Sequence, residues 1–252
     1  MLRWLAVVVA SLVAGAGAVM LADPGPSPQT VNLATVGATQ LNPGLPGQHV
    51  HNADEQAVAN QPDLPLDQAT RTQLAAQLTQ ARGVALSYPT AADALRSGYQ
   101  LAGGFAPGTG AHYVSLSGLS GPGSINVDRP EALIYDGTNP TSQIVGLMYY
   151  AMTPNAPEGF AGPNDHWHRH NGVCIRYTRS GIQVPLPADS DVTLGQCQAV
   201  NGSYLSVTGW MVHAWVVPGW ESPQGVFSHS NPNVLCADGT LNADKAGFCP
   251  GT

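Results

Sequence analysis

Three histidines occupy alternate positions in one short segment, where His166, His168 and His170 are separated by a tryptophan and an arginine. If this segment is extended, the three imidazoles point to one face, because successive side chains of a strand alternate between its two sides. A fourth histidine, His213, lies in a second strand-like run, residues 210–217, and could reach the same place. Since neutral imidazole is the commonest transition-metal ligand, the spacing predicts a metal site built on a sheet.

The expected ligands come from three strand-like segments and are, in order of preference, His168, His170, His213 and His112. His166 is assigned a supporting role, and Asp165 is the carboxylate expected to orient an imidazole through its second ring nitrogen. Imidazoles suit zinc and copper alike, so the sequence predicts one of the two without choosing. Met211 shares a face with His213; a thioether ligand there would favour copper, whereas an ordinary core methionine would favour neither.

The reaction class is not indicated by any motif. The zinc-protease pattern His-Glu-x-x-His is absent, as are a Gly-x-Ser-x-Gly elbow and a phosphate-binding glycine loop. No glutamate stands beside His168 or His170, which removes an obvious general base. Asp165, Glu158 and Glu221 are the acids that loops could bring to a metal.

The composition favours a loop-rich β domain. Charged residues make up 10% of the 252-residue chain, while 29 glycines and 21 prolines interrupt it. Long helices supported by surface ion pairs are disfavoured by so few charges. The net charge of −7 and the scattered cations argue against a nucleic-acid partner, whose phosphates require clustered Lys and Arg.

The N-terminal residues 1–22 have the pattern of a signal peptide, with one arginine before an apolar stretch that ends in small residues. If this segment is not cleaved, it is long enough to serve as a single membrane anchor, the only contact with a membrane that the sequence predicts. Either way, the protein is expected to be exported, to the extracellular space or the cell envelope.

Export gives meaning to the four cysteines, because an even number in an oxidising compartment indicates disulfides. Three pairings are possible, and we favour Cys174–Cys197 with Cys236–Cys249, since these close short sequential loops. A zinc-thiolate site is the competing interpretation, but no Cys-x-x-Cys pair supports it.

Three regions are expected along the chain. Residues 1–22 are the signal or anchor, residues 23–62 are a flexible Pro/Gly-rich tether, and residues 63–252 form a single mainly β domain that begins with helices. The tether carries a second His-x-His, His49 and His51, read either as solvated polar residues or as an auxiliary metal-capturing arm.

The expected fold is mainly β (α+β): an antiparallel sandwich or barrel preceded by two short helices. The helices are expected from Asp67 to about Ala81, and from a capping box at Thr90 and Asp93 to about Leu101. Asp136-Gly137 and Asn201-Gly202 are turn dipeptides, and the second predicts a hairpin. The candidate strands are 112–116, 132–135, 144–152, 173–177, 204–207 and 210–217.

The order of several motifs resembles a family of exported bacterial proteins known chiefly from actinobacteria and not assigned an activity. The matching segments cover roughly residues 80–250 and are Tyr88–Tyr99, Gly110–Tyr113, Trp167–His170 with Cys174, Met211–Trp215, and Gly225–Phe227 before Asn231-Pro232. The resemblance implies a shared fold and shared histidine positions.

Two functions are compatible with these observations. The first is an exported protein that binds a transition-metal ion through its histidines, in metal handling or as a small metalloenzyme whose open coordination position activates water or dioxygen. The second is a metal-free cell-envelope or carbohydrate-binding module, in which aromatic side chains line a groove. The aromatic residues for that groove are Trp167, Trp210, Trp215, Trp220, Tyr113 and Tyr149, which could equally form ordinary core.

Overall fold

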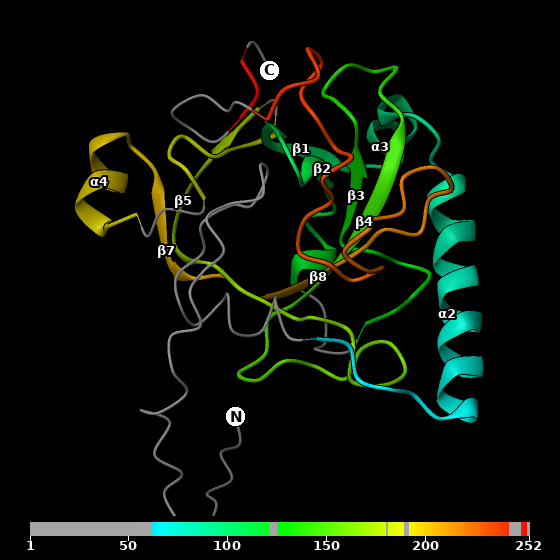
Figure 1. The fold of residues 1–252 in the computed structure, drawn as a ribbon. Helices are drawn as coiled ribbons and strands as arrows, with labels where there is room; N and C mark the ends of the chain where they lie inside the picture. Colours follow the sequence, from blue (N-terminus) through cyan, green and yellow to red (C-terminus); the bar gives the residue numbers. More distant parts are fainter. Residues whose placement is uncertain (1–61, 121–124, 180, 189–191, 242–247, 251–252) are drawn as a thin grey trace, which may run out of the picture. The chain divides into compact units, whose positions relative to one another are not determined.

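The computed structural model describes residues 62–120, 125–179, 181–188, 192–241 and 248–250 (Figure 1). The predicted signal or anchor, the tether up to residue 61 and its two histidines lie outside the described residues. Within the described residues, no helix combines the length and the apolar character needed to cross a bilayer.

The two predicted helices are present with different ends. Helix α2 (Gln68–Leu86) is capped by Asp67, whose carboxylate accepts a hydrogen bond from the backbone N–H of Thr70 at 2.9 Å. It continues past the expected end because no proline interrupts it, Gly83 is accommodated within it, and Ala81 and Ala85 are buried. It is therefore not a short helix.

Helix α3 (Ala91–Arg96) begins at the predicted capping box, in which Thr90 and Asp93 bond each other's backbone N–H. The prediction that it runs to Leu101 was wrong. Gly98 takes a left-handed conformation, φ +89°, so the helix stops at Arg96 and the chain enters a strand.

One mixed sheet of eight strands forms the body of the domain, in the order β7-β5-β6-β1-β2-β3-β4-β8. The pairs are antiparallel except β1 and β6, so the expectation of a purely antiparallel sheet needs that correction. The mainly β prediction is confirmed. The strands are β1 (Gln100–Ala106), β2 (Gly110–Val114), β3 (Ala132–Tyr135), β4 (Ile144–Ala151), β5 (Asn171–Thr178), β6 (Gly181–Gln183), β7 (Ser203–Val207) and β8 (Trp210–Ala214), with a short 3-10 helix η2 (Gly118–Ser120) and helix α4 (Leu194–Ala199) between them.

Two local predictions failed for identifiable reasons. The sequence assigns residues 100 and 101 to the end of the second helix, whereas Gly98 ends that helix early and β1 begins at Gln100. The Asn201-Gly202 turn does not join two strands: Asn201 has φ +55° and ends α4, after which β7 begins. The sequence did hold the signal for α4, because Thr193 and Gln196 form a capping box.

The sheet curls into a half-barrel. In a flat sheet β2 and β8, with two strands between them, would lie roughly 14 Å apart. Instead the Nε2 atoms of His112 on β2 and His213 on β8 are 3.2 Å apart. The face that carries these two side chains is therefore concave, and we call it the inner face; the opposite face is the outer face.

The two ends of the sheet meet at the segment 166–170, which carries His166, His168 and His170 and is called the histidine segment below. Strands β7 and β8 follow each other with two residues between them, and both pair with the segment 168–178. Just before β5 begins, His168 and Met211 exchange two backbone hydrogen bonds, of 2.9 and 2.7 Å, and form an isolated bridge. This bridge places the predicted metal-binding segment beside β8.

Both predicted disulfides are present. Cys174–Cys197 links β5 to α4, and Cys236–Cys249 closes a loop in the C-terminal region. All four cysteines are thereby used, so the alternative of a zinc-thiolate site is removed.

Candidate metal centre

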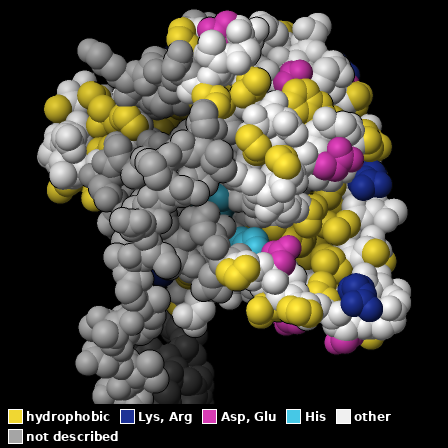
Figure 2. All heavy atoms as spheres, in the orientation of Figure 1, with side chains coloured by type: hydrophobic (Ala, Val, Ile, Leu, Met, Phe, Trp, Pro, Cys, Tyr) yellow, Lys and Arg dark blue, Asp and Glu magenta, His cyan; other side chains and the backbone are white. Residues whose placement is uncertain are grey.

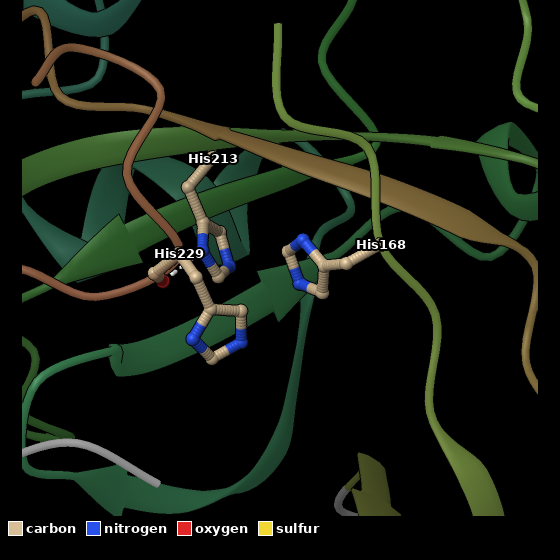
Figure 3. Close-up of side chains that lie close together, drawn as sticks. All are labelled: His168, His213 and His229. Carbon is tan, nitrogen blue, oxygen red and sulfur yellow. Dashed lines mark hydrogen bonds between the residues drawn. The ribbon is translucent and has the colours of Figure 1, made fainter. Parts of the chain in front are cut away.

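Three imidazoles converge at the seam between the sheet ends: His168, His213 and His229 (Figure 3). One nitrogen of each lies within 4.8 Å of the corresponding nitrogens of the other two. The three side chains come from the histidine segment, from β8 and from the loop that follows β8, so the site depends on the complete fold. This group of three is called the histidine cluster below.

His213 is held in one tautomer by the backbone. Its Nδ1 lies 2.6 Å from the carbonyl oxygen of His229, and a carbonyl can only accept, so Nδ1 carries the hydrogen. In the neutral ring the lone pair is then on Nε2. A ligand imidazole whose other nitrogen donates to a backbone carbonyl is the usual arrangement in metal sites.

His168 has a similar arrangement. Its side chain is 1% exposed, and its Nδ1 lies 3.4 Å from the carbonyl oxygen of His166 in the same segment. The backbone of His168 is fixed by the bridge to Met211, which sets the position of the ring. Its ring centroid is 4.3 Å from that of His229 and 5.4 Å from that of His213.

The loop that supplies His229 is fixed by buried polar contacts. The indole nitrogen of Trp215 donates to the carbonyl of Ser228 at 2.7 Å, directly before the histidine. Asn231, fully buried, donates from its backbone to the carbonyl of Gly108 at 2.7 Å and from its amide to the carbonyl of Trp220 at 2.6 Å. Since these groups are satisfied inside the protein, the loop presents His229 from a defined position.

His112 and His170 lie next to the cluster. The Nε2 atoms of His112 and His213 are 3.2 Å apart, and the ring centroid of His170 is 5.5 Å from that of His168. Two imidazole nitrogens on one tetrahedral zinc ion lie roughly 3.3 Å apart, given Zn–N bonds of about 2.05 Å. The spacing between His112 and His213 therefore suits a shared metal as well as a hydrogen bond.

The structure places two of the predicted supporting residues away from the cluster. The Nε2 of His166 lies 2.8 Å from the Asp63 carboxylate. Asp165 accepts hydrogen bonds from the indole of Trp167 and the backbone of Phe160, both at 2.9 Å, and not from a cluster imidazole. Burial raises the pKa of the Asp165 carboxyl to about 6, against the lowering effect of these hydrogen bonds.

The other predicted participants lie at the margin. Met211 is on the inner face beside His213 and lines the same cavity. Glu158 and Glu221 are exposed, and Glu221 accepts a hydrogen bond from the backbone of Gly219. Among the described residues, the group suited to a metal ion consists of imidazoles alone, without a carboxylate.

The sequence interpretation missed His229. It occupies a serine- and asparagine-rich loop, Ser228–Asn231, and stands alone without the alternate spacing that drew attention to the other histidines. The only signal was that loop composition, because buried serine and asparagine side chains are typical of a loop fixed by hydrogen bonds. No periodicity rule could place it beside His213.

A cavity of about 760 Å³ opens on the cluster. Four histidines contribute to its wall, His112, His170, His213 and His229, and the remaining described lining is mostly aliphatic or aromatic. Figure 2 shows histidine side chains reaching the surface on one face of the molecule, with hydrophobic side chains close by. The volume falls within the range of small-molecule sites.

Aromatic packing closes the back of the cluster. The ring of Trp215, 1% exposed, lies 5.6 Å from that of His213 and packs over Gly146, where a Cβ atom would approach the indole to 2.8 Å. Trp167 is also buried, 4% exposed. These two tryptophans therefore belong to the core and cannot line a sugar-binding groove.

Comparisons with protein-family models, with curated proteins and with solved structures found no match to this chain. The chemistry of the cluster therefore rests on its own geometry.

Proposed function

We propose that this protein binds one transition-metal ion through His168, His213 and His229, with His112 in reach as a fourth nitrogen ligand. The observation that supports this most strongly is the direction of the Nδ1 atoms of His213 and His168 toward backbone carbonyls. That direction places the lone pair of each neutral ring on Nε2, the nitrogen that would bind a metal. The burial of both side chains adds support, because burying a polar ring costs free energy unless its nitrogens are bonded.

The proposed metal is zinc or copper. A neutral, all-imidazole donor set suits both, whereas magnesium and calcium prefer oxygen ligands. The two disulfides fit an oxidising compartment, in line with export, and they leave no thiolate to compete for the ion.

We propose catalysis rather than metal transport as the role of the site. Structural zinc sites are closed by four protein ligands, whereas catalytic ones have three and keep a position for water or substrate. The cluster supplies three ligands and has a cavity beside it, so this position stays open when His112 hydrogen-bonds His213 and does not bind the ion. A metal there would supply a Lewis acid, and the buried Trp215 beside His213 would limit access of bulk water from that side.

Metal content tests the proposal. Protein purified without chelators and loaded with Zn²⁺ or Cu²⁺ should hold about one ion per chain, measured by elemental analysis after desalting. His168→Ala and His229→Ala should each weaken binding by at least tenfold in a competition titration with a chromophoric chelator. The histidine segment offers a matched control, since His166→Ala removes an imidazole two residues away that bonds Asp63 instead.

Two results would contradict the proposal. One is a metal content far below one ion per chain with both metals. The other is equal loss of binding in His166→Ala and His168→Ala, which would indicate nonspecific capture by histidines. His112→Ala then separates a four-nitrogen site from a three-nitrogen site, with a smaller loss expected if His112 only hydrogen-bonds His213.

A further inference from the structure

We infer that the cavity beside the histidine cluster binds an uncharged, largely apolar small molecule. Its polar end would face the part of the lining formed by His112, His170, His213 and His229, called the histidine wall below. The part of this inference that concerns the polar end rests on the proposed metal site. The apolar part rests on the cavity itself.

The walls of the cavity determine the class of ligand. Strands from both ends of the sheet contribute, with Met148 and Tyr150 from β4, Val173 and Ile175 from β5, and Leu205 from β7. None of the described lining residues is Asp, Glu, Lys or Arg. A charged group on the ligand would therefore lose its hydration away from the histidine wall without gaining a partner.

The opening of the cavity has the same character. Leu116, Met152 and Tyr177 line the cavity and are 39%, 62% and 64% exposed. Single exposed apolar side chains are common on proteins, but three at one opening mark a surface suited to apolar molecules. A ligand that enters here passes apolar side chains before it meets an imidazole.

The histidine wall provides the only concentrated polarity along the described lining, apart from isolated hydroxyl groups such as that of Thr109. A ligand with one oxygen function, such as a carbonyl or hydroxyl group, can direct it to a metal held by the cluster and leave its apolar part against β5 and β7. The substrate class is therefore an uncharged apolar compound with a terminal oxygen group.

Two probes test the two parts of the inference. N-phenyl-1-naphthylamine, an uncharged fluorophore, reports on the apolar cavity, and binding should not depend on zinc. Leu205→Trp fills the cavity from β7 and should weaken probe binding at least tenfold. Ser206→Trp adds the same side chain to the next residue, which is exposed, and should bind the probe like the wild type. If Leu205→Trp does not fold, Ile175→Trp fills the cavity from β5.

The second probe is a pair of hydroxamic acids, which are uncharged in solution at pH 7 and release one proton to the buffer when they chelate zinc; their binding is measured by calorimetry on the zinc-loaded protein. Octanohydroxamic acid should bind more tightly than acetohydroxamic acid by about fourfold for each added methylene. Leu205→Trp should remove this dependence on chain length and retain binding of acetohydroxamic acid. His168→Ala should lose both hydroxamates and retain the fluorophore.

The outcomes distinguish the inference from the proposed function. Fluorophore binding that is equal in the wild type and both cavity-filling variants overturns the apolar site, as does hydroxamate affinity independent of chain length. Failure to take up either zinc or copper, with fluorophore binding still blocked by Leu205→Trp, overturns the metal site and supports the apolar one.

Discussion

The two faces of the curled sheet differ although they share the same strands. On the outer face Leu133, Leu147, Tyr149 and Val212 are fully buried, and α2 packs against β4. On the inner face the alternate residues of the same strands, among them Met148 and His213, border a cavity of about 760 Å³. One face is filled by side chains, and the other leaves space.

This difference separates stability from function within single strands. Neighbouring residues such as Leu147 and Met148 point to opposite faces, so a substitution at one tests packing and at the other tests the cavity. If the separation holds, outer-face variants lower the free energy of unfolding and leave ligand binding unchanged. Inner-face variants change the binding of the metal or of the apolar ligand at a smaller cost in stability.

The largest effect is expected from Leu147→Ala. Removal of a fully buried leucine from a filled core should lower the free energy of unfolding by about 2–5 kcal/mol. Met148→Ala should cost less, about 2 kcal/mol, because this side chain already borders a void. Urea denaturation of both variants measures the difference, and equal losses would show that the inner face is packed as tightly as the outer.

Loss of the β5–α4 disulfide comes next. Replacement of Cys174 and Cys197 by alanine should lower the free energy of unfolding by about 3 kcal/mol, because a closed loop restricts the unfolded chain. The free energy is measured by urea denaturation under conditions that leave the other disulfide intact. Zinc affinity should not change, since both cysteines point away from the inner face; a parallel loss of affinity would contradict the separation of the faces.

Zinc binding should stabilise the protein through the inner face alone. At a free zinc concentration 100 times the dissociation constant, the free energy of unfolding should rise by about 2.7 kcal/mol. Because only neutral imidazole binds metal, this gain should be present above about pH 6.5 and disappear as the pH falls below it. Thermal unfolding with and without zinc at pH 5.5 and 7.5 measures it, with His168→Ala as the variant expected to show no gain at either pH.

The last effect concerns Glu131, which lies near Tyr99 and Tyr149 and accepts a hydrogen bond from the backbone of Tyr150. Burial raises the pKa of its carboxyl to about 7 from an ordinary 4.5. The folded state thus holds this proton more tightly than the unfolded chain, so stability should fall as the pH rises from about 4.5 to 7.

Glu131→Gln keeps an acceptor for Tyr150 and cannot ionise. The variant should lack that part of the pH dependence and should equal or exceed the wild type in stability at pH 8. Urea denaturation at pH 5 and pH 8 measures this. A wild-type stability that does not change over this range would contradict the assignment.

Local pattern drew attention to four histidines that the structure brings close to one another. His168, His170, His213 and His112 were identified from alternate spacing or from strand-like runs, and the curl of the sheet brings them together. The disulfide pairing followed from loop length in the same way. The disulfide pairing is confirmed because it depends only on short loops. The assignment of the four histidines as metal ligands stays a prediction.

The remaining parts depend on contacts that the sequence does not display. His166 shares the alternate spacing, yet the segment is bridged only at His168 and is not a regular strand, so its ring bonds Asp63. His229 is brought to the cluster by a loop whose position is fixed by Trp215 and Asn231. Spacing alone could neither exclude the first nor find the second.

The carbonyl that orients His213 belongs to the main chain of residue 229, whose own side chain is another proposed ligand. Because every amino acid carries that carbonyl, the side chain at 229 can be exchanged while the tautomer of His213 is retained. Aspartate, cysteine or methionine at this position would each present a donor of different hardness to the same ion. At residue 229 a single substitution would therefore change the metal preference of the proposed site while the orientation of His213 is retained.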